Sequence, residues 1–187
     1  DQIQRVVECS NMLSDTVTQL LNQATIVHRF QSQAFKPVTL DELVKEVCRD
    51  VAVTALQMGV ELIYLGKIKV EIEGDDFSLK QMIRNFMENA IKFSQMGDLV
   101  QVSLSLDEGY ANLSISDQGP GIPAVEKDLV FERFYRSQSN RRSGSGLGLA
   151  IAWEVALYHK AELKLMDNQP HGLVVEIRLP AGKGYNP

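Results

Sequence analysis

The sequence predicts an α/β two-layer sandwich, a mostly antiparallel mixed sheet with helices on one face, preceded by a long coiled-coil-like helix. Three observations lead to this fold class. The N-terminal stretch carries a heptad pattern without proline or glycine. Beyond it, helical and strand periodicities alternate along the chain. The strand patterns come in pairs separated by short turns, which favours antiparallel neighbours and one layer of helices.

The composition limits the possible functions of this 187-residue chain. Its net charge of −5 argues against a nucleic-acid partner. Cys9 and Cys48 lie far apart and lack metal-ligand spacing, which favours a reducing cytoplasm. No apolar run approaches the ~20 residues that span a bilayer. Because the chain begins with Asp1 rather than Met, we expect any membrane anchor to lie in segments outside it.

The first predicted unit covers residues 1–34 and the second covers 35–187. The first contains a seam in which apolar residues recur at intervals of three and four, with one polar member. The seam consists of Ile3, Val6, Ser10, Leu13, Val17, Leu20, Ala24 and Val27. One interpretation is an amphipathic helix that packs on its own domain. The sustained 3.5-residue period favours the other, a helical bundle or coiled coil between two chains.

The second unit opens with an extended segment over residues 35–38 and a helix from Leu40. Thr39 and Glu42 have the spacing of a capping box, and Gly59 is a candidate C-terminal cap. Residues 61–65 and 68–72 read as two strands joined in a hairpin around Gly66 and Lys67.

The rest of the unit repeats the same order of helix and strand pair. Asp75 or Asp76 caps a helix over about 77–93, and strands follow at 99–106 and 110–116 around a Glu108-Gly109 turn. A polar, glycine-bearing segment then leads to a helix from Leu147 to about His159. Strands at 162–166 and 173–179 close the fold.

Three polar residues share one face of the predicted 77–93 helix. Asn85, Asn89 and Lys92 are spaced by four and three residues. An asparagine carbonyl oxygen suits Mg²⁺, and a lysine one turn later suits a phosphate. The alternative is an ordinary solvent-facing stripe, with Glu88 pointing elsewhere on the helix.

A glycine-rich turn follows the predicted 110–116 strand. Asp117 ends the strand, Gly119 and Gly121 permit close backbone approach to a ligand, and Ile122 offers an apolar wall. A simple turn is the alternative, since Asp, Gly and Pro are common turn residues.

Glycines also open the predicted 147–159 helix, at 144, 146 and 148. Free N–H groups at a helix start favour phosphate oxygens. The pattern does not fit a dinucleotide fingerprint, because a polar loop rather than a buried strand precedes it.

Four segments in this order resemble the N, G1, F and G2 boxes of the GHKL (Bergerat) ATP-binding fold. They are Asn85–Ala90, Asp117–Gly121, Phe131–Phe134 and Gly144–Leu149. Within that superfamily the chain is most similar to sensor histidine kinases of two-component signalling, over about residues 35–180. The resemblance implies ATP and Mg²⁺ as cofactors, with Asn89 at the metal. The implied ATP-binding residues are Asn85, Asn89, Lys92, Phe93, Asp117, Gly119, Gly121, Ile122, Arg133, Phe134, Arg136, Gly144, Ser145, Gly146, Leu147 and Gly148.

The resemblance also implies roles for these residues. Asp117 would accept a hydrogen bond from the adenine amine, and Arg133 and Arg136 would reach the phosphates. Residues 137–144 would form a short ATP lid. The DNA gyrase branch has a glutamate base where this chain has Asn85, so the kinase branch is the closer match.

The implied reaction is transfer of the ATP γ-phosphate to a histidine outside this chain, and then to an aspartate of a response-regulator receiver domain. His28, His159 and His171 do not match the phosphoacceptor box, so we expect them to be structural or exposed. The first helix would form a homodimer in the full-length protein. The alternatives are a GHKL serine kinase of the anti-sigma-factor type and a catalytically silent dimerisation module.

Overall fold

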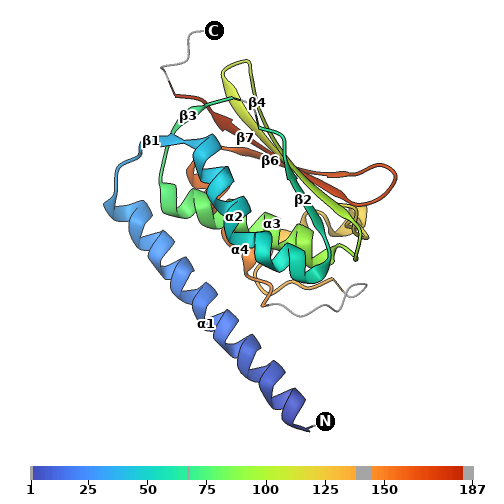
Figure 1. The fold of residues 1–187 in the computed structure, drawn as a ribbon. Helices are drawn as coiled ribbons and strands as arrows, with labels where there is room; N and C mark the ends of the chain where they lie inside the picture. The colour runs from blue at the N-terminus through green and yellow to red at the C-terminus, as the bar shows by residue number, and fades with distance from the viewer. Residues whose placement is uncertain (1, 67, 138–144, 183–187) are drawn as a thin grey trace.

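The computed structural model describes residues 2–66, 68–137 and 145–182. Figure 1 shows a layer of helices packed under a twisted sheet, while a long first helix extends beyond the sandwich. The elements are α1 (Gln2–Ser32), β1 (Lys36–Thr39), α2 (Leu40–Met58), β2 (Glu61–Tyr64), β3 (Glu71–Gly74), α3 (Asp76–Phe93), β4 (Leu99–Asp107), β5 (Tyr110–Ser116), the 3₁₀ turns η1 (Ala124–Glu126) and η2 (Leu129–Phe131), α4 (Gly148–Tyr158), β6 (Glu162–Asp167) and β7 (Leu173–Pro180).

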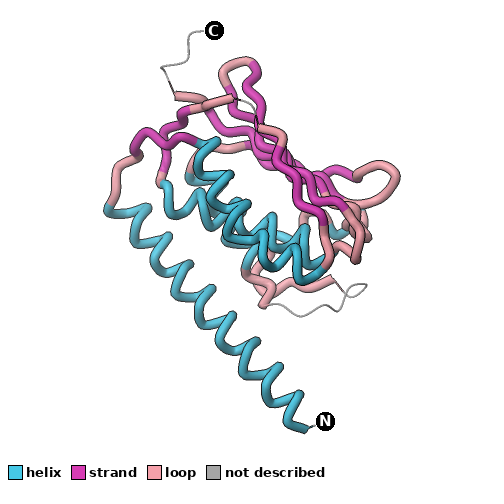
Figure 2. The backbone as a smooth tube through the Cα atoms, in the orientation of Figure 1, coloured by secondary structure: helices cyan, strands magenta, loops and turns pink. Residues whose placement is uncertain are grey.

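The main sheet has five strands in the order β2-β4-β5-β7-β6. β2 and β4 are parallel, and every other neighbouring pair in this sheet is antiparallel. α2, α3 and α4 lie on one face (Figure 2), so the predicted two-layer sandwich with a mixed sheet is confirmed. Glu108 and Gly109 both have positive φ, which suits the tight β4–β5 hairpin.

The predicted first hairpin is wrong. β2 pairs with β4, whereas β3 pairs with β1 in a separate two-stranded sheet. Both segments have strand periodicity, but periodicity does not specify a partner. The β3 register places buried Ile72 opposite buried Val38, over the helical layer.

The capping box predicted at the start of α2 is also absent. α2 does begin at Leu40, but the Thr39 side chain makes no capping hydrogen bond. The Leu40 N–H instead donates to the Val70 carbonyl at 2.8 Å, because the connection from β2 to β3 passes beside this end. Gly59 caps the other end in the left-handed conformation, as predicted.

The core lies between the sheet and its helices. Alternate residues of β4 and β5 point into it, including Val102 and Leu113, and meet Phe86 and Met87 of α3. The cap of α3 confirms the prediction, since the Asp75 carboxylate accepts from Ser78 N–H at 2.9 Å. α3 is therefore fixed at its start and along its apolar side.

α1 contacts the sandwich through its C-terminal half. Ile26 is fully buried, and the Phe30 ring stacks on Tyr158 with centroids 3.6 Å apart. Arg29 binds Asp75 with two nitrogens, one of them at 2.5 Å from the carboxylate. The described members of the heptad seam, from Val6 to Val27, are all exposed. The described part of the seam therefore does not pack on the sandwich, although the helix itself does through Ile26 and Phe30.

None of the helices in the described part of the chain has the length and apolar character that would let it cross a bilayer.

Candidate functional site

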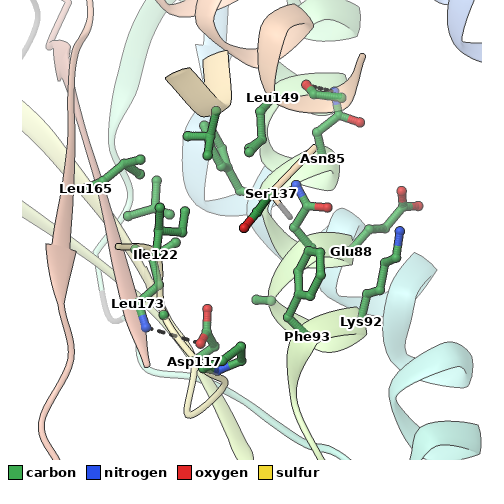
Figure 3. Close-up of a pocket in the computed structure, with 18 of the residues that line it drawn as sticks. Asn85, Glu88, Lys92, Phe93, Asp117, Ile122, Ser137, Leu149, Leu165 and Leu173 are labelled. Carbon is green, nitrogen blue, oxygen red and sulfur yellow. Dashed lines mark hydrogen bonds between the residues drawn. The ribbon is translucent and has the colours of Figure 1, made fainter. Parts of the chain in front are cut away.

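A pocket of about 620 Å³ opens between α3, the turn after β5 and the start of α4. Figure 3 shows side chains from these elements converging on it. Eleven predicted site residues line it: Asn85, Asn89, Lys92, Phe93, Asp117, Gly121, Ile122, Arg136, Ser145, Gly146 and Gly148. The fold thus brings together residues that lie far apart in the sequence.

Asp117 forms one end of this pocket and is 6% exposed. Its Oδ1 accepts from Gly119 N–H at 2.8 Å and Leu173 N–H at 3.2 Å. In Figure 3 the other carboxylate oxygen turns toward the cavity. Burial raises the pKa of Asp117, although the two N–H donors oppose that shift. A buried carboxylate with one oxygen facing a cavity is suited to accept a hydrogen bond from a ligand.

Glycines are required around this carboxylate. A Cβ on Gly172 would lie 2.0 Å from the Asp117 carbonyl oxygen, and one on Gly119 would lie 2.9 Å from the Phe93 carbonyl oxygen. Gly119 therefore packs behind the pocket instead of lining it. Gly172, which the sequence analysis did not select, holds the β6–β7 turn against Asp117.

α3 supplies the polar wall. Asn85, Asn89 and Lys92 face the cavity from successive turns, and the Lys92 Nζ lies 5.5 Å from the Phe93 ring centroid. Asn85 Nδ2 donates to the Gly148 carbonyl at 2.9 Å. This bond ties α3 to the first turn of α4, so the two walls of the pocket are held in register.

The glycine-rich segment forms the opposite end of the pocket. Gly146 has a φ of +73° and lies against the Phe134 backbone, where a Cβ would come within 2.8 Å. The Phe134 N–H donates to the Gly146 carbonyl at 2.9 Å. α4 begins at Gly148, so its first N–H groups and the positive end of its dipole face this end.

Some predicted residues lie elsewhere. Arg133 pairs with Glu154 of α4 at 2.5 Å, Phe134 is 64% exposed, and Leu147 is buried in the core. Gly144 and most of the predicted lid, residues 138–144, fall outside the described residues.

The pocket includes residues that sequence reasoning missed. Glu88 was expected to point away, but it lines the cavity and lies 4.0 Å from Arg84. Glu126, Tyr135 and Gln19 also line it. Glu126 and Tyr135 lie close in sequence to motifs that the sequence analysis identified. Gln19 belongs to α1, where no nearby motif indicates a site.

The possible metal ligands in the pocket fit a magnesium ion that also binds a phosphate. The described residues contain no group of three or more His, Cys, Asp or Glu that would enclose a metal. Asn89 lines the cavity, and its amide oxygen is of the ligand type that could serve as a single hard ligand. Mg²⁺ commonly takes one or two protein oxygens and fills its other positions with water and substrate phosphates.

The three histidines have structural or surface positions. His159 is buried: it accepts from the Asp75 N–H at 3.0 Å, and its Nδ1 bonds the Val155 carbonyl. Burial lowers the pKa of His159. His28 is exposed, and His171 lies 3.3 Å from the Gly119 carbonyl oxygen.

Comparison with known proteins shows the family. Residues 74–183 match the family described as "Histidine kinase-, DNA gyrase B-, and HSP90-like ATPase". This match covers α3, the Asp117 turn and α4, which build the pocket. The chain belongs to this family.

Its relatives in this family are sensor kinases. The signal transduction histidine-protein kinase/phosphatase MprB of Mycobacterium tuberculosis is 51% identical over 104 residues, which is 54% of this chain and 21% of the relative. The Mycobacterium ulcerans MprB is 36% identical over 174 residues, or 92% of this chain and 32% of the relative. The chain thus spans a third or less of these curated relatives.

Solved structures agree. A mycobacterial sensor histidine kinase MprB superposes with a TM-score of 0.71 at 38% identity, covering 79% of this chain and 97% of that one. Full-length ShkA in complex with AMPPNP gives a TM-score of 0.77 at 22% identity, covering all of this chain and 40% of that one, and shares the fold. The chain is a histidine-kinase ATP-binding catalytic domain of the GHKL type, and the anti-sigma-factor alternative is not favoured.

Proposed function

We propose that this domain binds Mg·ATP and transfers the γ-phosphoryl group to a histidine carried by a segment outside this chain. A ring nitrogen of that histidine attacks the γ-phosphorus, the bond to the bridging oxygen breaks, and ADP leaves. The phosphoryl group then passes to an aspartate of a response-regulator receiver domain. The pocket supports this proposal because its two ends have opposite chemistry.

The observation that carries the proposal is the pairing of Asp117 with the glycine-rich start of α4 across one cavity. Asp117 offers an acceptor, which suits the exocyclic amine of adenine. Gly146, Gly148 and the α4 dipole offer donors and positive potential, which suit phosphates. An adenine nucleotide is complementary to both ends, because its base carries a donor at one end and its phosphates carry acceptors at the other.

The remaining lining residues receive roles from their positions. Lys92 and Arg136 would neutralise phosphate charge, Ile122 and Phe93 would contact the base, and Asn89 would hold the magnesium ion. When bound, the ion would neutralise charge on the phosphate oxygens. Arg133 and Phe134 would act at the edge of the site, by fixing the segment that follows η2.

The polar wall also favours transfer over hydrolysis. Asn85, where the gyrase branch has a glutamate base, cannot take a proton and already donates to Gly148. Glu88 lies at the wall close to Arg84 and is half exposed, so its charge is screened. The domain would therefore hold ATP until a histidine is presented to it.

The exposed seam of α1 points to the partner in the full-length kinase. Val6, Leu13 and Val17 are each more than half exposed along one helical stripe. We propose that residues 1–34 are part of a dimerisation hairpin and that residues 35–187 are the catalytic domain. The kinase would be a homodimer in which this seam is buried, and the domain would act in the cytoplasm, with any membrane segment outside this chain.

A radiolabel experiment tests the proposal. The chain is mixed with [γ-³²P]ATP, Mg²⁺ and a helical-hairpin protein that carries a histidine in a phosphoacceptor box. We expect acid-labile, base-stable label on the hairpin and none on the chain alone. The same hairpin with that histidine replaced by alanine is the control. Label on a serine would support the anti-sigma-factor type of kinase, and label on the chain itself would show that one of its own histidines is the acceptor.

A further inference from the structure

α1 lies against the nucleotide pocket, in addition to carrying the exposed seam. α1 is anchored at Arg29 and Phe30. Further toward its N-terminus it contacts α4 through Gln23, whose amide lies 3.5 Å from the Glu154 carboxylate. One turn earlier, Gln19 reaches the cavity and is one of its lining residues. Figure 1 shows α1 running diagonally past the helical layer.

The contact made by Gln19 is with the glycine-rich segment itself. The Ser145 hydroxyl donates to Gln19 Oε1, and the Ser145 oxygen in turn accepts from the Leu147 N–H at 3.1 Å. Gln19 is thus joined by one hydrogen bond to the loop that leads into α4. Its amide lies at the end of the pocket that the proposed function assigns to the phosphates.

The chemistry of the amide is complementary to a phosphate. Within the described residues, the hydrogen bond of the Gln19 side chain is the one from Ser145, and it occupies the amide oxygen of Gln19. The amide nitrogen carries two N–H donors, and phosphate oxygens are acceptors. A glutamate in this place would present only acceptors and a negative charge.

From this geometry we infer that Gln19 is a nucleotide-binding residue that α1 contributes, donating from its amide nitrogen to the terminal phosphates. This inference rests on the proposed function. α1 is anchored on the sandwich one turn from Gln19 by Gln23, whose amide lies 3.5 Å from the Glu154 carboxylate, and two turns away by buried Ile26. The donor is therefore held in place before the ligand binds, which reduces the entropy cost of the contact.

A consequence is that the nucleotide connects two units of the protein. One ligand would contact α1 through Gln19, the glycine-rich segment through Gly146, and α4 through Gly148. Because coupling is reciprocal, nucleotide binding would strengthen the docking of α1, and undocking of α1 would weaken nucleotide binding. The effect would be larger for ATP and ADP than for adenosine, which has no phosphate to contact.

The test is a set of titrations of the whole chain with ATP, ADP and adenosine by calorimetry. The variants are Gln19→Ala and Gln19→Glu, and Gln31→Ala, at an exposed glutamine of the same helix, is the matched control. For Gln19→Ala we expect ATP affinity to fall about tenfold, the lower end for a hydrogen bond to a charged group. Gln19→Glu should lower it further. Adenosine affinity should stay within about twofold in both, and the control should bind ATP like the wild type.

The possible outcomes are distinct. Unchanged ATP affinity in both Gln19 variants would overturn the inference. An equal loss for ATP and adenosine would also overturn it, because it would show that Gln19 only supports the fold. Wild-type protein that binds neither ligand would instead contradict the proposed function. Thermal unfolding of each variant checks that the chain is folded before titration.

Discussion

Replacing Asp117 with asparagine should weaken ATP binding and reduce the preference for adenine. The reason lies in how the carboxylate is held. Oδ1 already accepts from the N–H groups of Gly119 and Leu173. The asparagine oxygen would take that position, because it alone can accept from both. Its NH₂ group would then face the cavity, opposite the amine of adenine.

The magnitude follows from this mismatch of donors. Loss of a hydrogen bond to a charged group costs about 1.5–3 kcal/mol, or roughly 10–150-fold in the dissociation constant. Guanine has a carbonyl where adenine has its amine, so wild-type protein should bind GTP poorly and Asp117→Asn should narrow the gap. Calorimetric titration with both nucleotides measures the two ratios.

Without nucleotide, the same substitution should increase the stability of the fold. Burial raises the pKa of Asp117 in the folded chain, so its ionised form opposes folding above that pKa. Asp117→Asn removes this buried charge and should raise the melting temperature at neutral pH. Asp107→Asn, at the exposed end of β4, is the control and should change neither property. Equal ATP affinity in the wild type and Asp117→Asn would refute the reasoning.

Three further predictions address the metal, the buried histidine and the α1 anchor. Mg·ATP should raise the melting temperature by binding only the native state, and Asn89→Ala should remove the Mg²⁺-dependent part of that shift; an unchanged shift would contradict the metal assignment. The lowered pKa of His159 means that the unfolded chain binds protons first, so stability should fall as the pH drops below about 6.5, the ordinary histidine value. His159→Gln should flatten that part of a denaturant-derived stability profile, and a profile identical to wild type would count against it. Arg29→Ala should lower stability by about 1 kcal/mol, discounted for partial exposure, and increase hydrogen exchange in α1, whereas the exposed Arg49→Ala should do neither.

The local elements could be predicted from the sequence because short-range physics specifies them. Helical periodicity, the Asp75 cap, the Gly59 cap and the Glu108-Gly109 turn all depend on neighbours within a few residues, and all appear in the structure. The pairing of β3 could not be predicted in the same way. Its strand pattern is equally compatible with pairing to β2 or to β1. Only the course of the chain after α2, which places β2 beside β4, excludes the pairing of β3 with β2.

The candidate site also contains residues that the sequence predicted and residues that only the structure revealed. Asn85, Asn89, Asp117 and the glycines stood out because their residue types are unusual in that spacing, and the resemblance gave them an order. Gln19 and Gly172 did not, because an isolated glutamine in a heptad helix and a glycine in a turn have no distinguishing pattern. Their importance depends on what lies opposite: Ser145 for one and the Asp117 carbonyl for the other.

The sequence by itself therefore determined the fold class, the nucleotide boxes and the absence of a gyrase-type glutamate at position 85. The tertiary structure decided which residues meet: that Asp117 faces the cavity with one oxygen, that Arg133 turns to Glu154, and that α1 reaches the glycine-rich loop. The physical reason is that side-chain spacing is encoded locally along helices and strands. Contacts between elements depend instead on burial and shape across the whole chain, which no short stretch of sequence contains.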